Sequence, residues 1–430
     1  MLPKVTIDLR GLVHLGKLSR GYFVTTIINQ ALPFLILPII TRYISPAEYG
    51  NLALFSLYLA LSNSLCGASV PTVISKFFFN TEKEYIASII GNSILIIAFL
   101  SLITMFLILI LSAFMQSFLE LPLVWLILIP LTSFAFILLS MGLTVMTNTQ
   151  SVLTFSKHQI GNTVINIIIS IILIVFLMWG WHGRALGIII SYLISAAGSY
   201  YYLRKKGYIS FDISKKITKT ILKVAIPLIP NSFQIVVISQ VGIFFMQFYF
   251  SMELLGLYSI GFQIALMVKL LNETLNISWS PYLFEQISRG NGMNKLYLTR
   301  LLWALIGILI AGMLFINLTA GIMLKLMTTP EYYGAQRFIL WFTLGFFFYG
   351  IYAFLFPILV KHEKQTYISI MTFLNMFIMI ILNFLGIKLF GFMGIAYAFT
   401  MTFFILFLAL FWQAQKVFPL PWLKALNIWN

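Results

Sequence analysis

The sequence predicts an all-α integral membrane protein with about 12 transmembrane helices, and three observations support this fold class. The mean hydropathy is +1.00, 61% of the residues are hydrophobic and only 9% are charged, values far outside the range of soluble domains. The apolar stretches are about 20 residues long, which is typical of membrane helices rather than of the short alternating strands of a barrel. Because lipid offers the backbone no hydrogen bonds, a helical bundle is the expected architecture.

The apolar segments predict six spans before a basic stretch in the middle of the chain and six after it. The expected spans are residues 22–40, 52–74, 86–111, 121–147, 160–180, 185–203, 224–249, 254–279, 298–322, 336–360, 366–387 and 391–413. We therefore expect an N-terminal lobe at 1–203, a basic cytoplasmic linker at 204–223 and a C-terminal lobe at 224–430. Residues 1–20 mix apolar and basic side chains, which is typical of a segment lying at the membrane surface.

The formal charge of +16 is explained by topology rather than by nucleic acid, because the basic residues lie in the tails and between the spans. Most of them fall on one side of the membrane. The five expected on the other side are Arg42, Arg184, Lys325, Arg337 and Lys388. By the positive-inside rule the first side is cytoplasmic, so both termini are expected there. We expect the arginines at the far ends of the spans to snorkel toward water, and the basic linker to lie beside anionic lipid headgroups.

The eighth expected span, residues 254–279, carries an unusual group of polar side chains. Lys269 and Glu273 lie near its middle, and Asn272 and Asn276 share the helical face of the lysine. Ionisable groups at that depth are costly and are usually functional. Two interpretations are open: a polar cavity wall that receives an anionic substrate, or an ion pair that satisfies itself within the bundle.

Two short matches indicate that the halves of the chain are related. Ser45-Pro-Ala-Glu-Tyr-Gly50 corresponds to Ser251-Met-Glu-Leu-Leu-Gly256, and Ala185-Leu-Gly-Ile188 corresponds to Phe392-Met-Gly-Ile395, with nearly the same offset in both cases. Since each half would hold an even number of spans, the repeats are expected to be parallel. Transporters built in this way bind cargo between two lobes, so we expect the first, second, seventh and eighth spans to line a cleft.

Several kinds of chemistry are missing from the sequence. There is no phosphate-binding loop of the G-x-x-x-x-G-K-[ST] type, so ATP is not expected to drive this chain directly. The two aspartates, Asp8 and Asp212, are far apart, and the four histidines lack metal-ligand spacing. The single cysteine, Cys66, cannot form an intramolecular disulfide. We therefore expect no enzyme activity, no metal and no cofactor.

The chain resembles the O-antigen (Wzx-type) flippases, polysaccharide transporters of the multidrug/oligosaccharidyl-lipid/polysaccharide (MOP) exporter superfamily. The resemblance covers nearly the whole length and rests on the two-lobe plan and on three motifs: Thr41-Arg-Tyr-Ile-Ser-Pro-Ala-Glu-Tyr-Gly50, Gly183-Arg-Ala-Leu-Gly187 and Trp279-Ser-Pro281. It implies two six-helix lobes around a central cavity, in the bacterial inner membrane. It also implies a flippase that moves an undecaprenyl-diphosphate-linked oligosaccharide, such as an O-antigen repeat unit, from the cytoplasmic to the periplasmic leaflet.

The resemblance assigns expected roles to the polar residues of the eighth span. Lys269 would hold the diphosphate, Asn272 and Asn276 would bind sugar hydroxyls, and Glu273 would be the carrier if a proton couples transport. Further candidates for substrate binding lie in the first span or at the two mouths of the expected cleft. They are Asn29, Gln30, Arg42, Lys157 and Lys364. A polymerase and a chain-length regulator of the same pathway are possible partners, together with membrane lipids.

Two other functions stay open on the sequence. A cation-coupled drug antiporter of the same superfamily would share the architecture, although such proteins usually carry more acids in the N-terminal lobe. A membrane-embedded glycan polymerase or ligase would be an enzyme, although these often carry a large periplasmic loop. A lipid II flippase of the same superfamily usually has two extra spans.

Overall fold

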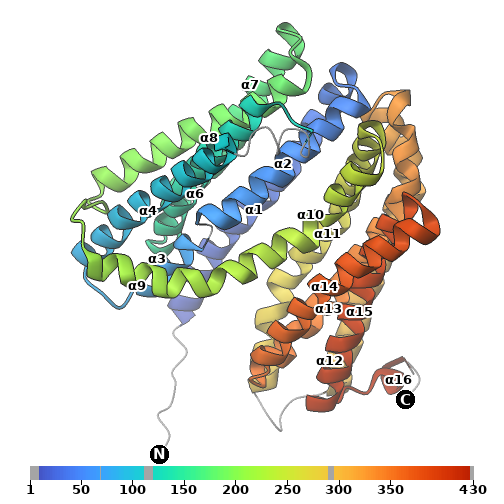
Figure 1. The fold of residues 1–430 in the computed structure, drawn as a ribbon. Helices are drawn as coiled ribbons and strands as arrows, with labels where there is room; N and C mark the ends of the chain where they lie inside the picture. Colours follow the sequence, from blue (N-terminus) through green and yellow to red (C-terminus); the bar gives the residue numbers. More distant parts are fainter. Residues whose placement is uncertain (1–8, 68, 111–119, 289–294, 427–430) are drawn as a thin grey trace, which may run out of the picture. The chain divides into compact units, whose positions relative to one another are not determined.

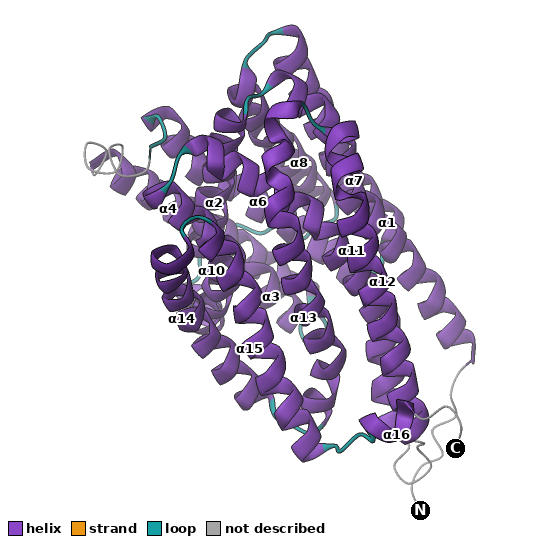
Figure 2. Ribbon diagram, turned by 90° about the vertical axis from the view of Figure 1, so that its right-hand side faces the viewer, coloured by secondary structure: helices purple, strands orange, loops and turns teal. Residues whose placement is uncertain are grey.

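The computed structural model describes residues 9–67, 69–110, 120–288 and 295–426, and in this part of the chain the secondary structure is helical, with no strand (Figures 1 and 2). The long helices of the first half are α1 (Leu9–Tyr43), α2 (Pro46–Cys66), α3 (Val70–Phe78), α4 (Lys83–Ile110), α6 (Leu123–Asn148), α7 (Val152–Ile171) and α8 (Gly180–Lys205). Those that follow are α9 (Lys215–Ala225), α10 (Ile229–Tyr249), α11 (Met252–Ser288), α12 (Lys295–Met327), α13 (Gln336–Lys361), α14 (Gln365–Phe390), α15 (Met393–Val417) and α16 (Trp422–Leu426). Short π or 3-10 turns follow α7, follow α9 and precede α13.

Among the described residues, ten helices are long and apolar enough to cross a membrane. Two helix pairs pass the same test when each is taken together: α2 with α3, bent by 45°, and the segment Lys215–Gln234 with Val236–Tyr249, bent by 46°. Counting each bent pair as one span brings the number to 12. The prediction of an all-α membrane protein with about 12 spans is therefore confirmed. Residues 1–8 of the expected surface segment lie outside the described residues, and the remainder of that segment continues directly into α1.

The chain forms two compact units. Unit 1 contains Met1–Ile44 and Leu54–Val236, and unit 2 contains Ser45–Ala53 and Val237–Asn430. The segment Ser45–Ala53, which includes the first two turns of α2, belongs to unit 2 although it lies in the first half of the chain. The basic helix α9 packs within unit 1.

The core of unit 1 is formed where α3, α4, α6, α8 and α9 meet. Fully buried aliphatic side chains such as Ile89, Ile137 and Met141 fill it. α7 packs on the flank of α8 and also contacts α1. As a result α7 lies between α1 and α8, and this arrangement creates the polar region described below.

Unit 2 is organised around α13, which packs between α11 and α15. Aromatic side chains fill its centre: Phe262, Phe342 and Phe399 meet edge to face with ring centroids 5.2–5.6 Å apart. This spacing is favourable for aromatic pairs. This cluster of rings makes the centre of unit 2 apolar.

The two segments matched in the sequence pack against each other within unit 2, and the contact is reciprocal. A Cβ atom added to Gly50 would lie 2.3 Å from the Met252 carbonyl oxygen, and one added to Gly256 would lie 1.8 Å from the Pro46 carbonyl oxygen. Each glycine occupies the sixth position of its segment, and each carbonyl belongs to the second. α2 and α11 therefore cross through equivalent residues, as expected of a pair related by an internal repeat.

Candidate functional site

The motif Gly183-Arg-Ala-Leu-Gly187 at the start of α8 allows this helix to approach α7 very closely. A Cβ atom added to Gly187 would lie 2.1 Å from Ser170 Oγ of α7. Small residues at helix contacts in membranes permit such an approach and bring polar side chains within hydrogen-bonding reach. The glycine thus determines which side chains of α7 and α8 can meet.

Polar side chains of α7 follow helical spacing along the face that meets α8. Asn166 donates to Ser191 Oγ at 3.2 Å, and Asn162 accepts from Ser195 Oγ at 3.0 Å. On the other flank, Thr163 donates to the Asn29 side chain of α1. α7 is therefore joined through amides and hydroxyls to both neighbouring helices.

These side chains surround a cavity of about 370 Å3 within unit 1. Its size is at the lower end of the range of small-molecule sites. It is lined from α1, α2, α7 and α8 by Asn29, Ser56, Leu59, Ala60, Asn63, Asn162, Thr163, Asn166, Ile167, Arg184, Ile188 and Tyr192. We call it the amide pocket, because four asparagines contribute to its wall.

The charge of the amide pocket comes from Arg184. Its Nη1 donates to Asn166 Oδ1 and, at 2.7 Å, to Ser170 Oγ, so two residues of α7 hold the guanidinium in place. None of the described residues that line the pocket is acidic. Asn63 Oδ1 is buried and has no hydrogen-bond partner among the described atoms. The pocket can therefore offer amide and hydroxyl groups together with one positive charge to a polar, anionic ligand.

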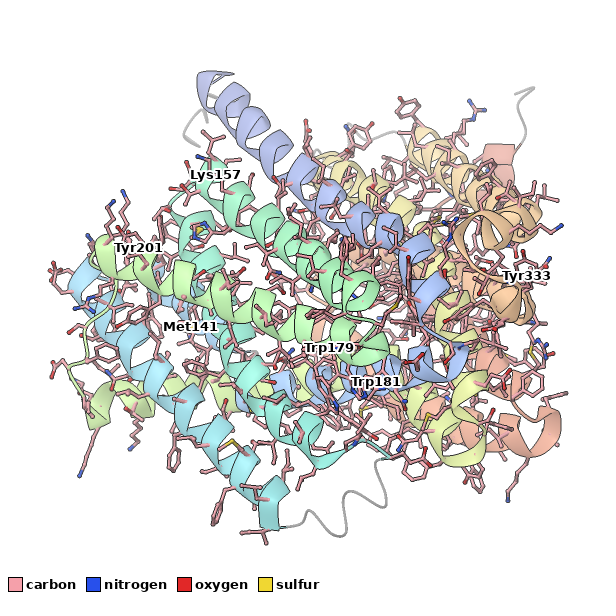
Figure 3. The ribbon with its side chains drawn as sticks, turned by 90° about the horizontal axis from the view of Figure 1, so that it is seen from above. Met141, Lys157, Trp179, Trp181, Tyr201 and Tyr333 are labelled. Atoms are coloured by element: carbon pink, nitrogen blue, oxygen red, sulfur yellow. The ribbon has the colours of Figure 1, made fainter. Side chains whose placement is uncertain are left out.

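The sequence prediction that Arg184 snorkels is wrong. Its guanidinium is held by side chains of α7, because the close helix crossing brings Asn166 and Ser170 within reach. Figure 3 shows Trp179 and Trp181 at this end of the α7–α8 pair and Lys157 and Tyr201 at the other end. Trp179 is 47% exposed, whereas Trp181 is buried.

In unit 2, the polar group of α11 contains an ion pair. Lys269 Nζ lies 3.3 Å from Glu273 Oε1, one helical turn further along, and the two side chains are 39% and 34% exposed. Tyr349 of α13 is an electrostatic neighbour of Glu273. The ion pair of the second interpretation is thus present, and both of its side chains are partly accessible.

The two asparagines of α11 lie differently from the ion pair. Asn272 is 1% exposed, and neither atom of its amide group has a hydrogen-bond partner among the described atoms. It faces α13, since a Cβ atom added to Gly350 would lie 3.3 Å from Asn272 Oδ1. Asn276 is half-buried, and its Oδ1 also lacks a described partner. The polar residues expected on one face of α11 therefore differ in exposure: the Lys269–Glu273 pair is partly accessible and Asn272 is buried.

The other predicted site residues are dispersed. Asn29 lines the amide pocket, and Gln30 is half-buried beside it in the chain. Arg42, Lys157 and Lys364 are exposed. The structure brings none of these three charged residues into the amide pocket.

Most residues of the amide pocket were missed from the sequence. Asn162, Thr163 and Asn166 fall within an expected span at the spacing of one helical face, and this pattern was the available signal. It was weaker than an intramembrane charge, because amides in membrane helices more often join helices than bind substrates. Here the same side chains bond to neighbouring helices and also line the cavity.

Comparison with solved structures shows which fold the chain has. A multidrug-resistance MATE family transporter of the MOP superfamily, in an inward-facing conformation, matches with a TM-score of 0.73 at 13% identity and covers 90% of this chain and 95% of its own. The lipid II flippase MurJ, in an inward closed conformation, matches with a TM-score of 0.68 at 16% identity and covers 94% and 90%. The chain thus has the fold of a multi-pass MOP transporter.

The family follows from the sequence comparison. Residues 20–287 match the family described as "Polysaccharide biosynthesis protein", and the chain belongs to this family. Two proteins of Haemophilus influenzae are each 26% identical to it. "Lsg locus putative protein 1" matches over 67% of this chain and 70% of its own length, and an "uncharacterized membrane protein" over 84% and 88%. The protein described here is a multi-pass protein of the bacterial inner membrane.

Proposed function

We propose that this protein is a flippase that transfers an undecaprenyl-diphosphate-linked oligosaccharide, an O-antigen or related repeat unit, from the cytoplasmic to the periplasmic leaflet. Transport would proceed by alternating access, with both termini in the cytoplasm. The positive-inside distribution of Lys and Arg supports this orientation.

One observation carries the proposal: a family member with a MOP fold contains an amide pocket with a fixed arginine and no acidic lining residue. The hydroxyls of a sugar both donate and accept hydrogen bonds, and asparagine side chains can satisfy both roles. The fixed guanidinium suits a phosphate or carboxylate oxygen of the same cargo. A pocket for a cationic drug would instead need negative charge, so the antiporter interpretation is less well supported.

Two groups of residues would act on different parts of the cargo. In unit 1, Arg184 and the amides of α7 would bind the polar head. In unit 2, Lys269 would attract the diphosphate when its ion pair opens, and Glu273 would carry a proton if a proton gradient drives the cycle. Glu273 is suitable for such a role because it is a partly exposed carboxylate within a span, next to a group that can compensate its charge.

The test is surface display of polysaccharide in a bacterial strain that lacks its own flippase. Arg184→Ala should reduce display about 10- to 100-fold, since a hydrogen bond to a charged group contributes about 1.5–3 kcal/mol. Arg184→Lys should restore part of it by keeping the charge. Membrane expression of each variant is matched by quantitative blotting.

Arg337→Ala serves as the control, because Arg337 is exposed and its Nε donates to the neighbouring Gly334 carbonyl at 2.9 Å. This variant should display polysaccharide normally. Full display by Arg184→Ala would remove the amide pocket from the mechanism. If the natural sequence failed to display polysaccharide but expelled a cationic drug, the antiporter would replace the flippase.

A further inference from the structure

Contacts with the rest of unit 1 fix which side of the basic helix α9 faces inward. Its buried side, Ile217, Ile221 and Ala225, belongs to the core of the unit. Asn92 of α4 fixes the helix start: its Nδ2 donates to the Asp212 carbonyl at 2.8 Å, and its Oδ1 accepts from the Ser214 backbone N–H at 3.3 Å. The lysines of α9 therefore cannot turn inward without breaking these contacts.

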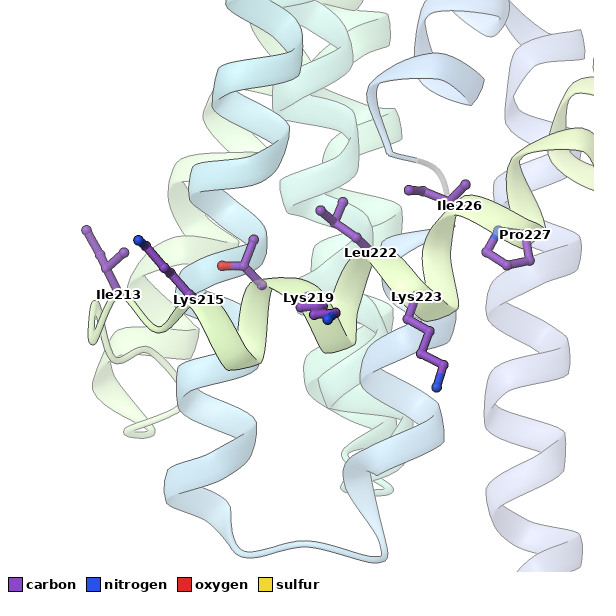
Figure 4. Close-up of a pocket in the computed structure, with 8 residues that line it drawn as sticks. Ile213, Lys215, Lys219, Leu222, Lys223, Ile226 and Pro227 are labelled. Carbon is purple, nitrogen blue, oxygen red and sulfur yellow. The ribbon is translucent and has the colours of Figure 1, made fainter.

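The outward side of α9 combines a row of cations with an apolar wall. Lys215, Lys219 and Lys223 recur every four residues and are all exposed. They border a groove of about 610 Å3 (Figure 4). The remaining lining residues are almost all apolar: Ile213, Thr218, Leu222, Ile226 and Pro227. We call this feature the linker groove.

The linker groove has an unusual balance of charge and hydrophobicity. In the described part of the chain, no carboxylate forms an ion pair with Lys215, Lys219 or Lys223. Like charges spaced four apart on a helix repel each other, so an anion placed among them is favoured. Ile213 is 75% exposed and Ile226 is 55% exposed, which leaves apolar surface beside the cations. A free phosphate would use the lysines but not this apolar wall.

The surroundings of α9 fit a position at the level of lipid headgroups, at the beginning of the bent segment that runs from Lys215 to Tyr249. It packs on α3 and on the beginning of α4, where the Ser210 N–H donates to the Ala87 carbonyl at 3.0 Å. The span of α4 begins at Lys83, whose Nζ lies 5.1 Å from the centre of the Tyr208 ring. Lysine and tyrosine at a span end are typical of the membrane–water interface.

We propose that the linker groove binds one anionic phospholipid, with its phosphate among Lys215, Lys219 and Lys223 and an acyl chain along Leu222, Ile226 and Pro227. The charge complementarity favours an anionic headgroup over a zwitterionic one. The exposed apolar wall favours a lipid over a soluble anion. The bound lipid would anchor α9 on unit 1, and this inference is independent of the cargo proposed above.

The experiment is native mass spectrometry of the purified full-length protein, stripped of lipid and titrated with phosphatidylglycerol or phosphatidylcholine. The natural sequence should bind one phosphatidylglycerol at least ten times more tightly than phosphatidylcholine. The combined variant Lys215→Gln, Lys219→Gln and Lys223→Gln should lose this preference. Leu222→Ser combined with Ile226→Ser should weaken binding of both lipids while the headgroup preference remains.

The matched control carries Lys205→Gln, Lys206→Gln and Lys216→Gln, which removes the same charge from exposed residues that do not line the groove. It should keep the preference. If both triple variants lost the preference for phosphatidylglycerol equally, the effect would be one of general charge and the proposal would be overturned. Retention of the preference in both variants would also overturn it. Competition by glycerol phosphate would indicate a site for soluble anions. Preferential displacement by undecaprenyl phosphate would make the groove a site for the cargo. Either result would overturn the phospholipid assignment.

Discussion

The α7–α8 pair of unit 1 and the α14–α15 pair of unit 2 correspond by the offset of the matched sequence segments, and both have a close contact at a glycine. At Gly187 the atom nearest to the added Cβ is a hydroxyl, Ser170 Oγ at 2.1 Å, and the Ser170 backbone nitrogen lies at 3.0 Å. At Gly394 the nearest atom is the backbone carbonyl oxygen of Gly386 at 2.0 Å. In the first pair, polar groups fill the space beside the crossing and line a cavity. In the second pair the backbones themselves meet.

The cation of the first pair has no counterpart in the second. With the offset of the matched segments, Arg184 corresponds to Gly391, which has a φ of +59° and ends α14. The amides of α14 are enclosed: Asn375 is 1% exposed and Asn383 is 0% exposed. The comparison shows that both helix pairs make a close contact at a glycine, whereas only the pair in unit 1 lines the amide pocket. Four asparagines are accessible to a ligand in unit 1, and those of α14 are not.

The largest expected effect concerns the crossings themselves. Gly394→Ala should destabilise the protein by about 3 kcal/mol, at the upper end of overpacking costs, because the new methyl group meets backbone that cannot rotate away. Gly187→Ala should cost less, about 1 kcal/mol by the same scale, because the Ser170 hydroxyl can turn aside and the nearest Ser170 backbone atom lies further away, at 3.0 Å. Thermal unfolding in detergent, followed by fluorescence, measures both.

The Gly187 variant should nevertheless lose transport, since moving the Ser170 hydroxyl removes one of the groups that hold Arg184. Normal transport in Gly187→Ala together with an unchanged unfolding temperature in Gly394→Ala would contradict the close crossings. Gly161→Ala is a suitable control in α7, because nothing lies within 4 Å of the added Cβ atom.

The second prediction separates accessible amides from enclosed ones. Asn162→Leu removes the acceptor of the Ser195 hydroxyl and one polar wall of the amide pocket, so transport should fall several-fold to about tenfold. Asn375→Leu should instead stabilise the protein by about 1 kcal/mol, because both polar atoms of the Asn375 amide lack a described partner. Display assays and thermal unfolding of the two variants test this contrast.

An equal loss of transport in both variants, at matched expression, would mean that the asparagine of α14 is also functional. Stabilisation by Asn162→Leu without loss of transport would show that the amide pocket does not touch cargo.

The smallest expected effect belongs to the ion pair of α11. Because Lys269 and Glu273 are 39% and 34% exposed, their coupling should contribute only about 0.2–1 kcal/mol to stability, which a double-mutant cycle with Lys269→Ala and Glu273→Ala measures. A coupling well above this range would assign the pair a structural role. Loss of transport in Lys269→Ala with preserved stability would instead support its proposed role in holding the diphosphate.

Much of the fold could be predicted from the sequence, because lipid allows so few backbone arrangements. The helical class and the span count followed from long apolar stretches. The two bent spans were predicted as single segments, since composition does not reveal the bend between α2 and α3 or the one near Gln234. The unusual charges of α11 were also visible, because an intramembrane Lys–Glu pair stands out against an apolar background.

The candidate site in unit 1 was only partly predictable. Asn29 was singled out, but Asn162, Asn166 and Arg184 were not recognised as one group. Arg184 lies at a span end, where its sequence position favours snorkelling. Its partners lie 14 and 18 residues earlier in the chain, so their approach depends on how closely α7 and α8 pack.

The sequence by itself determined the membrane environment, the helical class, the approximate number of spans and the family, because these depend on local hydropathy and on short motifs. Only the tertiary structure decided which polar residues face a common space. A residue on a membrane helix can face lipid, another helix or a cavity, and the choice depends on the distance and rotation of the neighbouring helix. Here Gly187 allows α8 to pack closely against α7. Because of this close packing, Arg184 bonds to side chains of α7 and lines the amide pocket.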